Sequence, residues 1–299
     1  MTEKLRVGIV GLGRIFDLHC LGYRENPLVE VVGLCDTRED LLRQRAAVFP
    51  GAQGVQSFEA LLRLNCDLVE VLTPHPLHAA MVCSALRAGS HVSVQKPMAM
   101  TLAEADQMIR GAREAGRHLR VFENFVFYPP LQKAKELLDG GTIGRPLHFR
   151  MKMVSGNREF AWHVPVETNA WRDMLGQQGL GGPLVFDHGH HMMAVALWLF
   201  GAVRDVFARI ETTELPSGRV IDAPASVLWR HVNPPVHGIW DVSVAPKMRV
   251  RTDYYASHEQ FEIQGEAGII QVNRASGRLL DEPVLTVYRD GEVCAFHNI

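Results

Sequence analysis

The stretch LRVGIVGLGRIF, residues 5–16, decides the fold of the first half of this chain. Residues 5–10 form a short apolar run, which is typical of a strand buried on both faces. Two glycines follow it directly, and a helical pattern continues to about Arg24. Glycines between a strand and a helix let the backbone approach a pyrophosphate, which the helix N-terminus also attracts. We therefore expect a dinucleotide site here, formed by Gly11 and Gly13.

Strand and helix patterns alternate regularly from this stretch to about residue 122. Further strands are expected at 29–34, near 55, and at 67–72, 91–95 and 119–122. Further helices are expected at 38–49, 58–64, 76–88 and 102–115. This alternation predicts an α/β fold with a doubly wound parallel sheet, a Rossmann domain over residues 1–123. Ligands of such sheets bind at the carboxyl ends of the strands.

The residue after the second predicted strand bears on the choice of cofactor. Asp36 stands there, 23 residues after Gly13. A carboxylate in that place can bind both ribose hydroxyls of NAD and repels the 2′-phosphate of NADP, although a turn aspartate would look the same. Arg38 keeps NADP open, because a guanidinium can hold that phosphate or stack on adenine. Phe16 occupies the third small position of the glycine fingerprint, so we expect a displaced helix or a ring that points elsewhere.

The stretch HVSVQKPM, residues 91–98, begins as a buried strand and ends on a lysine next to a proline. A lysine at a strand end is by itself more often a solvated surface charge than a catalyst. Lys96, however, ends a strand of the predicted cofactor sheet, where ligands are expected. Lys96 is therefore a candidate catalytic residue, and its case depends on the rest of the chain.

The second half contains the polar cluster DHGHH, residues 187–191, which runs into an apolar helix to Phe200. Asp187 and His191 are four residues apart and would share one helical face. The alternative is that Asp187 caps the helix and His191 is a core histidine. His188 and His190 would point to different sides of a helix, and no set of four ligands is complete, so no metal is expected.

The remaining second half is predicted to be an α+β domain over residues 124–299. Short alternating strands are expected at 146–154, 203–211, 225–230, 237–243, 260–264, 269–272 and 284–288. They suggest a large, mostly antiparallel open sheet with one face on the helices. Residues 162–182 are expected to form a loop over a substrate pocket, with Trp171 and Arg172 as candidate contacts beside His188.

Together these motifs resemble the Gfo/Idh/MocA oxidoreductase family, named after glucose–fructose oxidoreductase and inositol dehydrogenase. The matching pieces are Gly-Leu-Gly-Arg-Ile, Cys-Asp, Thr-Pro-x-x-x-His with Thr73, Pro74 and His78, Gln-Lys-Pro, and Asp-x-Gly-x-His. Family members usually carry glutamate where Gln95 stands. Asn124 matches an Asn-x-Arg pattern, but Val126 replaces its arginine. The chain also stops earlier than its relatives, at Ile299, so the sheet edge is expected to differ.

The resemblance implies a dehydrogenase or reductase that uses NAD, with NADP possible, on a sugar, cyclitol or related polyol. His191 would be the general base, since an ordinary histidine titrates near neutral pH. Lys96 would stabilise the reacting oxygen, and Asp187 would bind a hydroxyl or orient the histidine. Further cofactor contacts would be Arg14, Ile15, Thr73, Pro74, His78, Gln95, Lys96 and Asn124. The alternatives are an NAD-dependent glycoside hydrolase that works by transient oxidation, and a non-catalytic dinucleotide-binding protein.

Composition narrows the setting of this activity. A net charge of −2 gives nucleic-acid binding little support. The 5 cysteines are scattered, which favours reduced thiols in a cytoplasm. No apolar run approaches the roughly 20 residues of a membrane span, and the start leaves no room for a signal peptide. A homodimer or homotetramer through the second domain's sheet is expected, with apolar area from Trp229, Trp240 and Tyr255.

Overall fold

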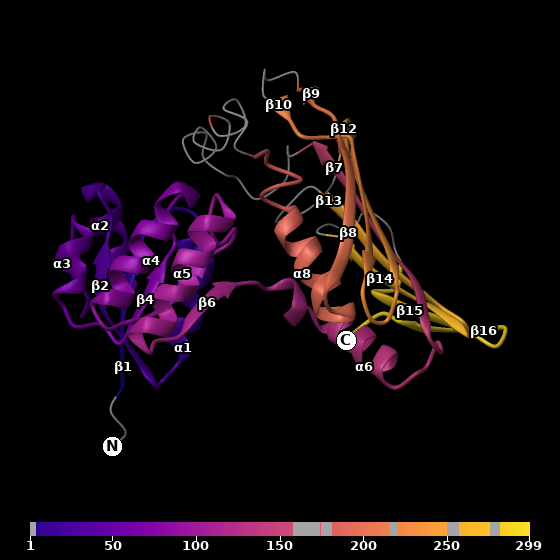
Figure 1. The fold of residues 1–299 in the computed structure, drawn as a ribbon. Coiled ribbons are helices and arrows are strands. Elements are labelled where there is room, and N and C mark those ends of the chain that lie inside the picture. Colours follow the sequence, from indigo (N-terminus) through magenta and orange to yellow (C-terminus); the bar gives the residue numbers. More distant parts are fainter. Residues whose placement is uncertain (1–3, 158–173, 175–180, 216–219, 250–256, 276–281) are drawn as a thin grey trace. The chain divides into compact units, whose positions relative to one another are not determined.

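The computed structural model describes residues 4–157, 174, 181–215, 220–249, 257–275 and 282–299 (Figure 1). Contacts along the chain divide these residues into two compact units, which meet between Phe122 and Glu123 in the sequence. No helix in the described ranges is long and apolar enough to cross a membrane.

The first unit is a parallel sheet of six strands in the order β3-β2-β1-β4-β5-β6. Its strands are β1 (Leu5–Val10), β2 (Val29–Cys35), β3 (Gln53–Val55), β4 (Leu68–Val71), β5 (His91–Gln95) and β6 (Leu119–Phe122). Its helices are α1 (Phe16–Glu25), α2 (Glu39–Ala46), α3 (Phe58–Leu62), α4 (His78–Arg87) and α5 (Leu102–Ala115), with a 3-10 turn η1 (His75–Leu77). The predicted doubly wound parallel sheet is confirmed.

Two separate apolar cores explain why helices cover both faces of this sheet. Phe16, Cys20 and Leu42 bring α1 and α2 onto one core. Leu61 and Met108, with the apolar side of α4, belong to the other. The chain moves from β1 outward to β3, then returns to β4 on the other side of β1. The sheet therefore has its switch point between β1 and β4, where ligands of such folds bind.

The second unit is built on a sheet of eight strands in the order β16-β15-β14-β13-β7-β12-β11-β8. These strands are β7 (Pro146–Asn157), β8 (Val203–Ile210), β11 (Ala225–His231), β12 (His237–Arg249), β13 (Ser257–Gly265), β14 (Gly268–Ala275), β15 (Leu285–Arg289) and β16 (Glu292–Phe296). A small two-stranded sheet pairs β9 (Thr213–Glu214) with β10 (Val220–Ile221). All neighbours in the large sheet are antiparallel except β7 and β12, so the predicted open sheet is confirmed.

One face of the large sheet forms the core of the second unit with α6 (Pro129–Asp139), α8 (Gly189–Phe200) and the 3-10 turn η2 (Phe125–Phe127). Phe149, Met151 and Met153 of β7 point into this core, as their alternation predicts. Trp229 and Trp240 lie in it as well. The expectation that these two tryptophans add apolar area to an oligomer face is therefore wrong, because they pack against the helices. Tyr255 lies outside the described residues.

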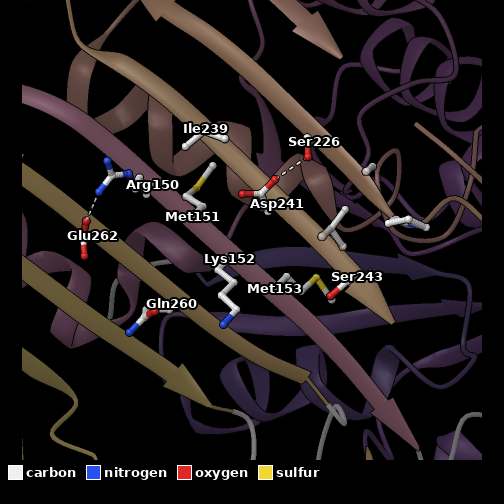
Figure 2. Close-up of a pocket in the computed structure, with 13 residues that line it drawn as sticks. Arg150, Met151, Lys152, Met153, Ser226, Ile239, Asp241, Ser243, Gln260 and Glu262 are labelled. Carbon is white, nitrogen blue, oxygen red and sulfur yellow. Dashed lines mark hydrogen bonds and ion pairs between the residues drawn. The ribbon is translucent and has the colours of Figure 1, made fainter. Parts of the chain in front are cut away.

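The opposite face of the sheet carries polar side chains around a shallow depression of about 490 Å³ (Figure 2). Lys152 and Gln260 line it as register partners on β7 and β13, and two bonded pairs lie on the same face. The Arg150 guanidinium donates to Glu262 at 2.9 Å, and the Ser226 hydroxyl donates to Asp241 at 2.6 Å. Arg150 and Glu262 thus neutralise each other on this face, whereas the partner of Asp241 is a neutral hydroxyl.

Candidate active site

Gly11 directly follows β1 at the switch point of the first unit. Its φ of +90° is a conformation that side-chain-bearing residues rarely adopt. A Cβ there would stand 2.7 Å from the Leu72 carbonyl carbon, so only glycine lets the ends of β1 and β4 approach this closely. At Gly13 an added Cβ would meet nothing within 4 Å. The loop backbone therefore borders open space at Gly13, the cradle that a pyrophosphate needs.

Asp36 organises the turn beside this loop. Its Oδ2 accepts a hydrogen bond from the Leu12 amide at 2.8 Å, and its Oδ1 accepts one from the Arg38 amide at 2.9 Å. Each carboxylate oxygen has two lone pairs, so the group can still accept from ribose hydroxyls. The Arg38 guanidinium binds Asp40 in a bidentate pair of 3.1 and 2.5 Å, which also lowers the pKa of Asp40. An arginine held in this way is less suited to a 2′-phosphate.

Phe16 departs from the glycine fingerprint without disturbing the loop. The ring is fully buried and meets Phe49, in the turn after α2, edge-on at 6.2 Å between ring centroids. The Arg45 guanidinium lies 5.4 Å over the same ring, and it also pairs with Asp17 at 2.6 Å. The sequence allowed either a displaced helix or a ring that points away from the glycine loop, and the structure shows the second.

His78 lies between the ends of β4 and β5, and in its neutral form its one N–H can donate to only one of the two backbone carbonyls that flank it. Its Nε2 lies 2.9 Å from the Thr73 carbonyl oxygen and its Nδ1 lies 2.9 Å from that of Pro97. The side chain is fully buried, and burial lowers its pKa. The prediction that His78 contacts the cofactor is therefore corrected, because the imidazole is fully buried against the backbone that follows β4 and β5. Thr73 and Pro74 remain at the end of β4, next to the glycine loop.

Lys96 follows β5 directly and is half-buried. Its amide donates to Oε1 of Gln95 at 2.7 Å. The Gln95 Nε2 in turn lies 2.9 Å from Nε2 of His19 on α1. The amide of Gln95, predicted to touch the cofactor, is thus engaged inside the first unit. Arg14, another predicted contact, bonds Asp17 at 2.7 Å.

In the second unit, the turn before α8 is built around Asp222. The carboxylate accepts hydrogen bonds from the amides of Leu184 at 2.8 Å, Val185 at 2.7 Å and Phe186 at 3.4 Å. A Cβ at Gly182 would lie 2.0 Å from the Asp222 carboxyl carbon, so glycine is required beside it. Asp222 thereby fixes the turn that presents the next residues, an arrangement that the sequence pattern did not reveal.

The helix begins later than predicted. Asp187 and His188 stand in the turn, and α8 starts at Gly189. The expectation that Asp187 and His191 share a helical face is corrected accordingly, because the Asp222 contacts hold the preceding residues in a turn. The fixed glycine of the motif has a packing reason. A Cβ on Gly189 would lie 2.9 Å from the Trp240 ring.

The partner of His191 is Glu123, which the sequence analysis missed. Nδ1 of His191 lies 2.7 Å from Oε2 and 2.9 Å from Oε1 of Glu123. The ring also stacks on Phe125 at 4.2 Å, with only 4° between the planes. A carboxylate only accepts, so Nδ1 must carry the proton and the lone pair of the neutral ring lies on Nε2. The imidazole is thus oriented for a general base. The available sequence clue was a carboxylate immediately before Asn124.

A second buried carboxylate lies near this dyad. Glu259 is 1% exposed, 2.5 Å from an Arg274 nitrogen and 3.1 Å from Nε2 of His188. Burial alone would raise the pKa of Glu259, but these two partners outweigh it and hold the pKa at about 2. The Arg274 guanidinium stacks 3.8 Å over the Phe125 ring. His188, a predicted substrate contact, therefore faces a carboxylate that is charged at neutral pH.

Three other positions were predicted to contact the cofactor or the substrate. Asn124 is exposed at the start of the second unit, before η2. Trp171 and Arg172 lie outside the described residues. Within the ranges that the structure covers, no cluster of three or more histidine, cysteine or acidic side chains has the geometry of a metal site.

Comparison with known proteins covers both units. Residues 5–123 match the model of an oxidoreductase family with an NAD-binding Rossmann fold, and residues 131–271 match the GFO/IDH/MocA C-terminal domain. A 1-carboxy-3-chloro-3,4-dihydroxycyclohexa-1,5-diene dehydrogenase from Comamonas testosteroni is 35% identical over 68% of this chain and 49% of its own length. The chain thus spans about half of that relative.

Two further matches extend along most of the chain. D-apiose dehydrogenase from Paraburkholderia graminis is 27% identical over 93% of this chain and 68% of the relative. The crystal structure of the WlbA dehydrogenase from Bordetella pertussis, in complex with NADH and UDP-GlcNAcA, has a TM-score of 0.75 at 25% identity. It covers 92% of this chain and 75% of that one. The two units thus occur in the same order in proteins that bind a nicotinamide cofactor.

Proposed function

The chain belongs to the Gfo/Idh/MocA oxidoreductase family, and we propose that it is an NAD(P)-dependent dehydrogenase or reductase of a sugar, cyclitol or related polyol. Residues 1–123 would hold the dinucleotide and residues 124–299 would bind the substrate. The bound nicotinamide supplies hydride acceptance or donation at its ring. The residues of the chain provide orientation, proton transfer and charge stabilisation.

The observation that carries this proposal is the Glu123–His191 pair. Glu123 fixes the imidazole with its proton on Nδ1, so that Nε2 can take the proton from a substrate hydroxyl as hydride leaves. The neighbouring carboxylate also stabilises the imidazolium that then forms. Because Glu123 orients His191, Asp187 is not needed for that role, and we propose that it binds a substrate hydroxyl instead. Lys96 is assigned to the reacting oxygen, where its ammonium stabilises alkoxide character.

NAD is the proposed cofactor, with NADP as the weaker alternative. The open space at Gly13 and the carboxylate of Asp36 support a dinucleotide with free ribose hydroxyls. The Arg38–Asp40 pair also supports NAD, because the Arg38 guanidinium would have to leave the Asp40 carboxylate in order to bind the 2′-phosphate of NADP.

The test follows reduced nicotinamide absorbance at 340 nm with purified protein, NAD or NADP, and a panel of sugars, cyclitols and sugar acids, together with their keto forms and NADH. We expect turnover of at least one polyol, with NAD preferred. Binding of NAD without turnover on the whole panel would contradict the proposal. Aryl glycosides in the same panel detect hydrolysis, since phenol release without net NADH would point to that activity instead.

Assembly through the large sheet is proposed as well, as a homodimer or homotetramer. Phe207, Leu228 and Ile239 are register partners across β8, β11 and β12 on the face away from the core. Phe207 is 67% exposed and Leu228 42%. An apolar row of this kind supports association. Sedimentation velocity should show an oligomer that Leu228→Arg dissociates, and a monomeric parent protein would contradict the proposal.

A cytoplasmic location is proposed from the thiols. Cys20, Cys35, Cys66 and Cys83 are all buried and unpaired by disulfides. Burial, with Asp36 and Glu59 nearby, raises the pKa of Cys35 to about 11, so that thiol stays protonated and unreactive. Such cysteines suit a reducing compartment. Fractionation of the native host with an antibody would test this, and recovery outside the cytoplasmic fraction would contradict it.

A further inference from the structure

Four buried or half-buried polar side chains form one hydrogen-bonded chain inside the first unit. His19 and Tyr23 come from α1, Glu70 from β4 and Gln95 from β5. Nδ1 of His19 lies 2.9 Å from Oε1 of Glu70, and the Tyr23 hydroxyl donates to Oε2 of the same carboxylate. Nε2 of His19 lies 2.9 Å from Nε2 of Gln95. The chain ends on the backbone of Lys96, whose amide donates to Oε1 of Gln95 at 2.7 Å.

The donors and acceptors of this chain fit together in only one way. The Lys96 amide is a donor, so Gln95 must turn its oxygen to it and its NH₂ group to His19. His19 must then accept at Nε2, which places its single proton on Nδ1. Glu70 accepts a hydrogen bond from Nδ1–H of His19 and a second one from the Tyr23 hydroxyl. The imidazole is therefore neutral and held in the Nδ1-protonated tautomer.

Burial makes this arrangement costly to break. The side chains of His19 and Glu70 are 3% and 2% exposed. A buried carboxylate that lost a partner would be left with an unmatched charge, which is strongly unfavourable. Burial and the Glu70 carboxylate also raise the pKa of Tyr23, so its hydroxyl remains a donor. The His19 ring is supported from the side by Phe122, 4.2 Å away between ring centroids.

We propose that His19 and Glu70 are positioning residues that lock the Gln95 amide and, through it, the backbone from which Lys96 projects. This inference rests on the proposed role of Lys96 at the reacting oxygen. The lock requires an amide at position 95. A carboxylate there cannot donate to His19, so the imidazole would need a second proton in order to donate to both neighbours.

The first test reads the tautomer directly. Protein labelled with ¹⁵N-histidine is studied by long-range ¹H–¹⁵N correlation at pH 7.5, and the His19 signals are assigned by their loss in His19→Gln. We expect a neutral ring with the proton on Nδ1. In Gln95→Glu we expect the doubly protonated ring. An Nε2-protonated or doubly protonated ring in the parent protein, or an unchanged ring in Gln95→Glu, would overturn the proposal.

The second test reads the effect on Lys96 without any need for turnover. Hydrogen exchange of the Lys96 amide should accelerate ~10-fold or more in His19→Gln and in Glu70→Gln, because the acceptor on Gln95 is no longer held. His118→Gln is the matched control, since His118 is an exposed histidine of the same unit. Equal Lys96 exchange in all three variants would show that the buried chain does not hold this backbone.

Kinetics separate a positioning role from a merely structural one. In His19→Gln and Glu70→Gln we expect kcat to fall ~10–100-fold, as for a small misplacement of a catalytic group, with little change in the Kd for NAD. His118→Gln should keep the parent kcat. Unchanged kcat in the folded variants would overturn the positioning role while the proposed function stands. If the parent protein turns over no substrate of the panel, the proposed function fails. The tautomer and hydrogen-exchange measurements then still show whether His19 and Glu70 hold the Gln95 amide.

Discussion

Nδ1 of His191 lies 2.7 Å from Oε2 of Glu123, although the two residues stand 68 positions apart in the chain. The contact joins the start of α8 to the first residue of the second unit. It leaves the ring with one tautomer when neutral and places the basic lone pair on Nε2. In the proposed reaction this oriented ring would take the proton that a carbinol loses as hydride leaves.

Removal of the Glu123 carboxylate should therefore act on the chemical step. In Glu123→Gln we expect kcat to fall ~10–100-fold with a smaller change in KM, because the imidazole loses its orientation and the partner of its charged form. Steady-state kinetics across pH 6–9 measure both effects. Glu136→Gln on the exposed side of α6 is the control. Equal kcat and pH profiles in the parent protein and Glu123→Gln would contradict the assignment.

Asp36 should decide between the two dinucleotides. In Asp36→Ala the ribose acceptor disappears and so does the repulsion of a 2′-phosphate, so the ratio of kcat/KM for NAD to that for NADP should fall ~10-fold or more. The variant also removes the acceptor of the Leu12 amide, so KM for NAD should rise. Kinetics with both cofactors check the prediction. A ratio unchanged from the parent would mean that Asp36 serves only the turn.

A substitution at Gly189 tests the packing between the start of α8 and Trp240. In Gly189→Ala the new methyl group would lie 2.9 Å from the Trp240 ring, and we expect a loss of about 1–3 kcal/mol in the free energy of unfolding. Gly22→Ala is the matched control, because it lies within α1 and its Cβ would meet nothing within 4 Å. That control should be neutral or slightly stabilising. Urea denaturation compares the two, and equal stabilities would contradict the packing argument.

His78 should make stability depend on pH. Burial lowers the pKa of His78 in the folded protein below its ordinary value of 6.5. As pH falls below about 6.5 the unfolded chain therefore binds a proton that the folded protein does not, and the free energy of unfolding decreases. Urea denaturation at pH 7.5 and 5.5 should show this loss. His78→Asn should have a lower free energy of unfolding than the parent protein at both pH values, but this free energy should fall less between pH 7.5 and 5.5. An equal fall in the two proteins would exclude His78 as a source of the pH dependence.

Local patterns predicted the first unit closely, because each strand and helix there is defined by its own neighbours in sequence. The expected bounds of β1 and β6 agree with the structure to the residue. The strand β16 was missed because its residues are largely exposed and do not alternate clearly. Its hairpin turn was nevertheless marked by Asp290-Gly291, whose positive φ angles of 54° and 81° suit a two-residue turn.

Tertiary partners were the part that local patterns did not supply. Glu123 holds His191, and Asp222 holds the turn at Leu184, across 68 and 38 residues. The position of Glu123 directly before Asn124 was a clue to a carboxylate there, but no local pattern pairs either acid with its distant partner. Asp187 was placed on α8 from its spacing alone, and the contacts to Asp222 explain why the helix begins two residues later. The identity of Gln95 was visible, but its role required the positions of His19 and Glu70.

The most direct test of the account compares the initial rate of NADH formation by the parent protein, Lys96→Ala and His191→Asn with the best polyol of the panel. Circular dichroism confirms that each variant is folded. We predict that kcat/KM falls ~100-fold or more in both variants while the Kd for NAD changes little, since the proposed function assigns both side chains to the substrate oxygen. Full turnover by a folded Lys96→Ala or His191→Asn protein would contradict the central claim.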